Sequence, residues 1–373
     1  RSYYYAFNSY NCDEANEATQ HERFSFTLPS PGSPNALAPH ARVAGNDREE
    51  PTWRAFIEEN KFDKGGCVCF LSIPKGGDFQ KLWTRRSGDE PPQLQRLGAP
   101  DSPFPIFMPS HGRPRIAKLD ISSMMKGRKY AQIVCVKHSQ FEKYRNLWPR
   151  LTIFALPEMA EKYGIGASRY WIMELARKIC PDECKVIYMQ DDSLYGYAGV
   201  TLPSDPQPHH HDYAFERRPI TKKISLLSIL EHFGRRREFP MTELEKFAAI
   251  GFPRKGRYPP NSKNAHERRH FYSAGLFNVK KLAEMKINFD PRIRVWEDIE
   301  FIKRGSTHED FVVVRCNRFL QLKTNFMSGG CTHVERLHGD SMAGMAGMAA
   351  MTPVSPMSTT TGSMTGGASS TGS

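Results

Sequence analysis

The sequence predicts a mixed α/β fold in which a mainly parallel central sheet is flanked by helices, with disordered tails at both ends. Three observations support this prediction. Apolar, strand-like runs alternate with helical patterns between residues 131 and 190. The stretches between these runs are long enough for parallel crossovers, which need roughly a dozen residues. The last run ends at Asp191–Asp192, and ligands of open α/β sheets gather at such strand ends.

Composition favours a folded, basic protein. The 373 residues are 39% hydrophobic, which suffices for one large domain or two modest ones. Lys and Arg outnumber Asp and Glu by 52 to 40, and the net charge of +12 favours polyanionic partners, although a basic surface that only aids solubility is an equal alternative. The 8 cysteines lack the spacing of zinc ribbons or disulfide scaffolds, so we expect buried free thiols in a reducing compartment.

The chain divides into three stretches. Residues 1–50 show no periodicity and are expected to be disordered, and 336–373 form a low-complexity tail of Met, Ala, Gly, Ser and Thr. The folded domain is expected at 51–335, with its core at about 120–335. We find neither a signal peptide nor a transmembrane segment, so we expect no membrane insertion and an intracellular location, with the nucleus as a candidate compartment.

The first half of the domain follows the order strand, helix, strand, helix, strand. The three strands are predicted at 131–136, 151–156 and 185–189. Ser139 and Glu142 form a capping box that predicts the start of the first helix, which Pro149 ends. A turn at Gly164–Gly166 opens the second helix.

The second half mixes helices and strands. We expect a strand or helix at 222–233, a helix capped by Thr242 and Glu245 and closed at Gly251, a strand at 271–277, a short helix at 296–303 and a strand at 311–314.

The acidic pair after the third strand is the main candidate site. Adjacent carboxylates at Asp191 and Asp192 repel each other unless a cation or a hydrogen-bond donor compensates them. Mn²⁺ and Mg²⁺ prefer oxygen ligands and leave positions for substrate phosphates. The pair therefore suits a cation that bridges a diphosphate and acts as a Lewis acid on the leaving group. The alternative is a pair of solvated turn residues.

This chain order resembles the glycosyltransferase A fold, which is Rossmann-like. The Gly-x-Gly turn, the Asp-Asp step, the strand at 271–277 and Trp296-Glu-Asp298 carry the likeness, which covers about 120–335. More narrowly, the chain resembles the TET-associated glycosyltransferases, relatives of the base J glucosyltransferase. The resemblance implies a metal-dependent enzyme that transfers a sugar from a nucleotide-diphosphate donor, such as a UDP-hexose, to a hydroxyl. Hydroxymethylated pyrimidine in DNA and protein Ser or Thr are the two acceptors it suggests.

The resemblance also implies roles for particular residues. The metal ligands would be Asp192, Asp191 and His333. The nucleotide-sugar donor would be bound by Val136, Lys137, Gly164, Gly166, Arg169 and Asp191. The catalytic base would be Asp298 or Glu297, and Trp296 and Gly275 would contact the acceptor.

The chain departs from the family's Asp-x-Asp motif at one position. Gln190 places an amide where the first carboxylate is expected. This change lowers the local negative charge and weakens the expected metal or ribose contact, but it leaves Asp192 in place as the terminal acidic residue.

Two other functions compete with this interpretation. The segment His266-Glu-Arg-Arg-His270 matches the zincin pattern, in which two histidines bind zinc and Glu267 acts as a base. Its two inner arginines oppose metal binding, so a solvated basic loop is the preferred interpretation. The second competitor is a non-catalytic, nucleic-acid-binding module that keeps the fold. The basic runs at 235–237 and 254–257 would supply its phosphate contacts.

Overall fold

The computed structural model describes residues 20–31, 33, 35–36, 49–60, 66–76, 80–95, 102–201, 221–234, 241–255 and 265–324. The chain divides into two units, Arg1–Val334 and Glu335–Ser373, and every described residue belongs to the first. The predicted tail at 336–373, His333 and the basic run at 235–237 therefore lie outside the described residues.

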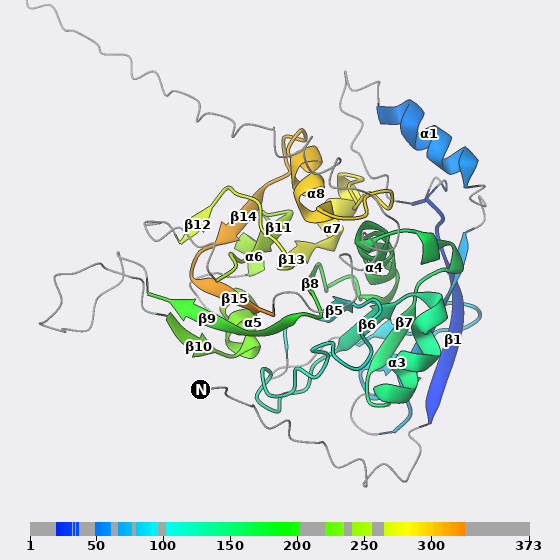
Figure 1. The fold of residues 1–373 in the computed structure, drawn as a ribbon, viewed down its shortest axis with the longest axis horizontal. Helices are drawn as coiled ribbons and strands as arrows, with labels where there is room; N and C mark the ends of the chain where they lie inside the picture. The colour runs from blue at the N-terminus through cyan, green and yellow to red at the C-terminus, as the bar shows by residue number, and fades with distance from the viewer. Residues whose placement is uncertain are drawn as a thin grey trace, which may run out of the picture. The chain divides into compact units, whose positions relative to one another are not determined.

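Among the described residues, a 10-stranded mixed sheet runs through the fold in the order β1-β2-β7-β6-β5-β8-β13-β11-β14-β12 (Figure 1). In that order the strands are β1 (His21–Leu28), β2 (Cys67–Pro74), β7 (Thr152–Ala155), β6 (Gln132–Val136), β5 (Ile106–Pro109), β8 (Val186–Gln190), β13 (Ala274–Asn278), β11 (Ala249–Gly251), β14 (Val313–Cys316) and β12 (His266–Glu267). The central strands β7, β6, β5 and β8 pair in parallel, and antiparallel pairs flank them. The predicted α/β class with a mainly parallel central sheet is confirmed.

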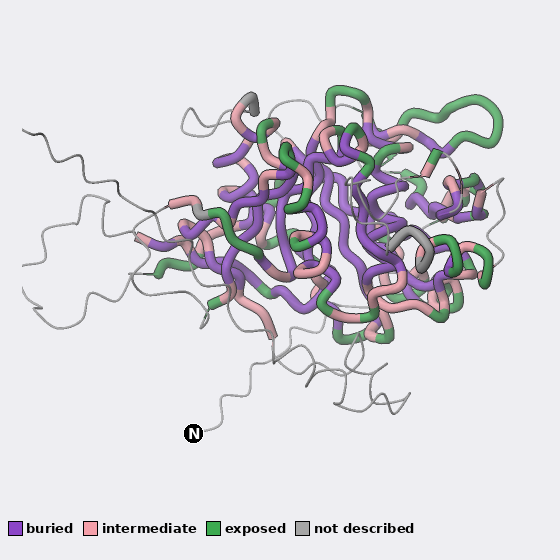
Figure 2. Tube along the Cα trace, turned by 90° about the horizontal axis from the view of Figure 1, so that it is seen from above, coloured by how far each residue is buried: buried purple, intermediate pink, exposed green. Residues whose placement is uncertain are grey.

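Helices cover both faces of this sheet. One core contains residues of α4 (Ile165–Ile179), α7 (Val279–Glu284) and α8 (Glu297–Gly305). The other contains residues of α3 (Phe141–Leu147), α5 (Leu226–Gly234) and α6 (Met241–Leu244). Because both faces are covered, the four central parallel strands are buried along their whole length, which explains their apolar sequences (Figure 2).

A smaller sheet lies beside the end of β8. Its strands are β10 (Thr221–Ile224), β9 (Leu194–Val200) and β15 (Phe319–Lys323), in that order. β9 starts two residues after the acidic pair, and β15 pairs with it so that Lys323 lies opposite Leu194. This pairing brings the end of β15 to the acidic pair. A separate short hairpin joins β3 (Trp83–Thr84) to β4 (Gln93–Leu94), and α1 spans Glu49–Glu59.

Two groups of sequence predictions need correction. Disorder of residues 1–50 is wrong for β1, which pairs along its length with β2 and stacks Phe26 on Phe154. Both capping boxes are also wrong. Ser139 bonds the carboxylate of Glu161 instead of capping α3, with its hydroxyl 2.9 Å from Oε2. The helix predicted to be capped by Thr242 and closed at Gly251 is α6, which begins at Met241 and ends at Leu244. Thr242 therefore lies inside the helix, and the chain continues into β11.

The state of the cysteines and the absence of a membrane-spanning helix can both be compared with the described residues of the first unit. Six cysteines of the described ranges form no disulfide, and all but Cys184 are buried: Cys67, Cys69, Cys135, Cys180, Cys184 and Cys316. No helix within the described ranges is long and apolar enough to span a bilayer.

A pair of glycines seats the ring of Phe271 on the sheet. Gly251 on β11 and Gly275 on β13 are paired in register. A Cβ at Gly251 would lie 1.7 Å from the Phe271 Cγ, and one at Gly275 would lie 2.7 Å from its Cε2. These close approaches explain why both positions are glycine.

We therefore expect Gly251→Ala to lower the free energy of unfolding by about 1–3 kcal/mol, because the added methyl group overlaps the Phe271 ring. Urea unfolding followed by tryptophan fluorescence measures this loss. Gly196→Ala on β9 is the matched control, since its Cβ would lie 3.6 Å from Leu322 Cδ1, an ordinary contact. Equal unfolding midpoints for the two variants would contradict the packing argument.

Candidate active site where the central parallel strands end

Polar side chains from distant parts of the chain meet at the edge where β5 and β8 end. Parallel strands place their carboxyl ends at one edge, so loops that follow them converge there. The residues are Ser110 and Arg113 after β5, Asp191 and Asp192 after β8, Arg169 on α4, Ser273 before β13, Glu297 and Asp298 at the start of α8, and Lys323 at the end of β15.

Asp192 is held by two donors from the loop after β5. Its Oδ2 accepts a hydrogen bond from the Ser110 hydroxyl at 2.5 Å, and its Oδ1 accepts one from Arg113 Nη1 at 2.9 Å. The side chain is only 4% exposed. Burial raises the pKa of Asp192 to about 6, although Arg113 and Ser110 act in the opposite direction.

Asp191 is compensated by two cations. Its Oδ1 accepts from Arg169 Nη2 at 3.0 Å, and its Oδ2 accepts from Lys323 Nζ at 2.6 Å. Burial acts to raise the pKa of Asp191, but Lys323 and Arg169 outweigh it and lower the pKa to about 2. Asp191 is therefore ionised at neutral pH.

Arg169 links the acidic pair to the start of α8. Its guanidinium is buried and lies 3.0 Å from Asp191 through Nη2 and 3.0 Å from Glu297 Oε1 through Nε. The same guanidinium lies over the ring of Phe289, 5.6 Å from its centroid. Arg169, which the sequence predicts to bind the nucleotide-sugar donor, thus lies inside the site and contacts acidic side chains there.

Glu297 and Asp298 supply two further buried carboxylates. Asp298 accepts from the backbone amide of Ile299 at 2.9 Å and from that of Ser273 at 3.4 Å. Burial raises the pKa of Glu297 to about 7, against the effect of Arg169, and burial also raises the pKa of Asp298. A carboxylate with a raised pKa can accept a proton near neutral pH, as a general base must.

The structure explains the amide at Gln190. Its side chain is buried and its Oε1 accepts a hydrogen bond from the hydroxyl of Tyr197 at 2.8 Å. Tyr197 in turn bonds the hydroxyl of Tyr188. Gln190 therefore serves the core beneath β9, and a carboxylate there would be buried among tyrosines.

The contacts that Asp191 and Asp192 make in this arrangement do not fit a divalent cation. Each oxygen of Asp191 and Asp192 accepts a bond from a protein donor, and three of the four donors are cationic. A metal ion at this pair would face Arg113 and Lys323 at close range. The third expected ligand, His333, lies outside the described residues.

The predicted donor-binding glycines have a packing role. A Cβ at Gly164 would lie 2.5 Å from the Arg294 Cα, and one at Gly166 would lie 2.4 Å from the carbonyl oxygen of Ile293. The amide of Gly166 donates to that oxygen at 3.1 Å. The segment before α8 therefore packs on the start of α4, and nucleotide contact by these glycines stays a prediction.

Two other residues predicted to bind the nucleotide-sugar donor have buried side chains, and their contact with the nucleotide stays a prediction. Val136 is fully buried in the core, so its side chain has no surface for a nucleotide. Lys137 is also buried, and its ammonium donates to the backbone oxygens of Ala160 and Tyr163. Lys137 therefore links the end of β6 to the segment before α4.

The predicted acceptor residues have different surroundings. Trp296 precedes Glu297 directly, is 39% exposed and adopts a left-handed backbone conformation with φ of 63°. Its ring is therefore partly accessible to solvent. Gly275 is buried beneath the Phe271 ring, and its contact with an acceptor stays a prediction.

The zinc-protease alternative is wrong. His266–Glu267 form strand β12, paired with β14, and residues 268–270 are not helical. The zincin pattern needs both histidines on one face of a helix, and this segment forms no helix. The described parts of the chain contain no group of at least 3 His, Cys, Asp or Glu side chains able to hold a metal.

Ser110, Arg113 and Lys323 belong to the site but are missed by the sequence analysis. β5 is four residues long and lies between Pro105 and Pro109, which obscures its strand pattern. The available signal was the apolar run that ends at Pro109, followed by Ser110 and a glycine turn with an arginine. Lys323 carries no local signal, because only the pairing of β15 with β9 brings it to Asp191.

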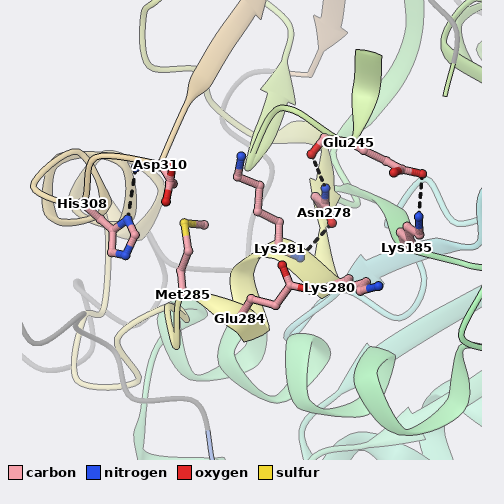
Figure 3. A pocket seen from close by; sticks show the side chains of 9 residues that line it. All are labelled: Lys185, Glu245, Asn278, Lys280, Lys281, Glu284, Met285, His308 and Asp310. Atoms are coloured by element: carbon pink, nitrogen blue, oxygen red, sulfur yellow. Dashed lines mark hydrogen bonds and ion pairs between the residues drawn. The ribbon is translucent and has the colours of Figure 1, made fainter. Parts of the chain in front are cut away.

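A polar hollow of about 550 Å³ lies elsewhere, between α7 and the loop before β14 (Figure 3). Lys185, at the start of β8, lines it together with Asn278, which pairs with Val186. The hollow therefore lies at the opposite end of β8 from the acidic pair. Its Lys185 ammonium is neutralised by Glu245 at 2.9 Å.

Arg169→Met tests whether this guanidinium stabilises the site. The variant leaves Glu297 and one oxygen of Asp191 without their cation, so we expect a loss of about 3–5 kcal/mol in the free energy of unfolding at pH 8. The loss should shrink as the pH falls, because protonation removes the uncompensated charge. Urea unfolding across pH measures it, with Lys178→Met on the same helix, 39% exposed, as the control that stays near wild type. A pH-independent loss would indicate a packing effect instead.

Comparisons with known proteins agree with the resemblance drawn from the sequence. Residues 104–330 match the model of a family described as TET-Associated Glycosyltransferase. The chain is 26% identical over 244 residues to the GREB1-like protein of Homo sapiens, 25% over 243 to that of Danio rerio, and 21% over 243 to Protein GREB1 of Homo sapiens. Each match covers 61% of this chain but 12% of the relative, so the chain corresponds to a small part of these proteins. Since the family model covers more than half of the sequence, this chain belongs to the TET-Associated Glycosyltransferase family.

Proposed function

We propose that this domain transfers a sugar from a nucleotide-diphosphate donor, such as a UDP-hexose, to a hydroxyl acceptor. One observation carries the proposal. Asp191 and Asp192, at the end of β8, meet Glu297 and Asp298, about a hundred residues later in the chain, at the ligand-binding edge of the sheet. The family to which the chain belongs supports a glycosyltransferase-like function.

The reaction assigns a distinct task to the carboxylates. The acceptor oxygen attacks the anomeric carbon of the donor sugar while its proton passes to a carboxylate. The bond from that carbon to the diphosphate oxygen breaks, and its electron pair leaves with the diphosphate. We assign the proton acceptor to Asp298, with Glu297 beside it as the alternative. The raised pKa of each carboxyl group supports this role.

Trp296 is the proposed acceptor platform. Its partly exposed ring directly precedes the two candidate bases, and an aromatic face suits a sugar ring or a nucleic-acid base. We propose hydroxymethylated pyrimidine in DNA or protein Ser or Thr as the acceptor class.

Asp298→Asn should reduce kcat by about 10²–10⁴, because the amide keeps the shape of the carboxylate but cannot accept the proton. Transfer or donor hydrolysis against a panel of nucleotide sugars measures the rate. Glu300→Gln on the same helix, which replaces a carboxylate paired with Arg304, is the matched control and should keep the rate. A larger loss in Glu297→Gln than in Asp298→Asn would move the base to Glu297.

Wild-type protein that shows no turnover with any donor, yet binds DNA through salt-sensitive contacts unaffected by Asp298→Asn, would identify a non-catalytic binding module instead.

The pH dependence follows from the raised pKa values. A general base works only when deprotonated, so kcat/KM should fall as the pH falls through the raised pKa, which for Glu297 is about 7. The fall of kcat/KM at low pH should be present in the wild type and absent in the variant that lacks the base. A flat profile between about pH 5 and 8 would contradict a buried carboxylate base.

A further inference from the structure

The departing diphosphate needs positive charge, and this inference about its source rests on the proposed function. The charge of a leaving group is stabilised best by donors already held in place. Two cations at the site, Arg113 and Lys323, come from the ends of β5 and β15 and contact the acidic pair directly. No role was assigned to either by the sequence.

Arg113 is held in place by its surroundings, and one of its N–H donors, Nε, has no acceptor among the described residues. Its backbone amide donates to the hydroxyl of Tyr144 at 3.1 Å, and the neighbouring Pro114 oxygen accepts from Trp148 Nε1 at 2.7 Å. Its Nη1 bonds Asp192, but its Nε is buried and has no hydrogen-bond partner within the described parts of the chain. The side chain as a whole is 15% exposed, so a part of it other than the buried Nε is open to a ligand.

Lys323 is held in a similar way. Its ammonium donates to Asp191 at 2.6 Å and to the Ser273 hydroxyl at 2.7 Å, and an ammonium carries a third N–H. The side chain is 21% exposed. Lys323 also acts to lower the pKa of Asp192, so the two cations act on the same acidic pair.

We propose that Arg113 and Lys323 bind the diphosphate of the nucleotide donor, and that the site works without a divalent cation. Asp191 and Asp192 then act as positioning residues that hold these two cations, since each of their oxygens already accepts a protein donor. Arg169 stays between Asp191 and Glu297. A guanidinium forms bidentate contacts with phosphate oxygens, and an ammonium adds a point charge, so the pair suits a diphosphate.

The test measures the affinity of the full 373-residue chain for UDP by isothermal titration calorimetry, in EDTA and in Mn²⁺. We expect UDP to bind in EDTA with an affinity close to that in Mn²⁺. Arg113→Ala and Lys323→Ala should each raise the Kd about 10- to 100-fold, the effect of one charge-assisted hydrogen bond. Arg115→Ala, an exposed arginine in the same loop, is the matched control and should not change the Kd. Thermal melting confirms that each variant is folded.

Asp192→Asn separates the two accounts further. If Asp192 only positions Arg113, the Asn side chain keeps an oxygen that can accept from Arg113, so UDP binding in EDTA should persist. If it ligates a metal, Mn²⁺-dependent binding should disappear.

Each other outcome is informative. Binding that requires Mn²⁺ would overturn this inference and leave the proposed function standing. Binding in EDTA that survives both Arg113→Ala and Lys323→Ala would overturn the assignment of the two residues. An absence of UDP binding in every buffer would overturn the proposed function itself, and this inference with it.

Discussion

The guanidinium of Arg169 is buried between Asp191 and Glu297, and the site depends on this contact. Moving a charge out of water is costly, so a buried arginine requires carboxylates close to it, and those carboxylates require the arginine. The three residues come from α4, the end of β8 and the start of α8. These two ion pairs therefore hold the start of α8, which carries the candidate bases, against the end of β8, which carries the acidic pair.

The same balance of charge explains the chemistry expected of the site. Asp191 faces two cations and stays ionised, whereas Glu297 and Asp298 share the effect of a single arginine and have raised pKa values. Neighbouring carboxylates therefore differ in the task that each can perform. The ionised one positions cations, and those with a raised pKa can accept a proton near neutral pH. In this account the positive charge for the diphosphate is built into the protein.

The fold was predictable from the sequence to the extent that it rests on local patterns. The runs at 131–136, 151–156 and 185–189 and the helix after Gly164 are confirmed as β6, β7, β8 and α4, because fully buried parallel strands must be apolar throughout. The capping box at Ser139 was wrong because the Ser139 hydroxyl bonds Glu161, which lies 22 residues further along the chain. Local spacing cannot reveal such a competitor.

The site was predictable only in part, for the same reason. Acidic residues at the end of a strand stand out, so Asp191 and Asp192 could be found. The donors that hold them could not, because Arg113 follows a very short strand and Lys323 arrives through sheet pairing. Gly275 makes room for a phenylalanine ring, although a glycine near a nucleotide site also suits close approach of a ligand.

The place where the nucleotide binds decides whether Arg113 and Lys323 hold the diphosphate, and a crystal structure of the complex with UDP would show it. We expect the diphosphate to lie within hydrogen-bond distance of Arg113 and Lys323, at the edge where β5 and β8 end. A diphosphate bound at the opposite end of β8, in the hollow beside Lys185, would contradict this expectation.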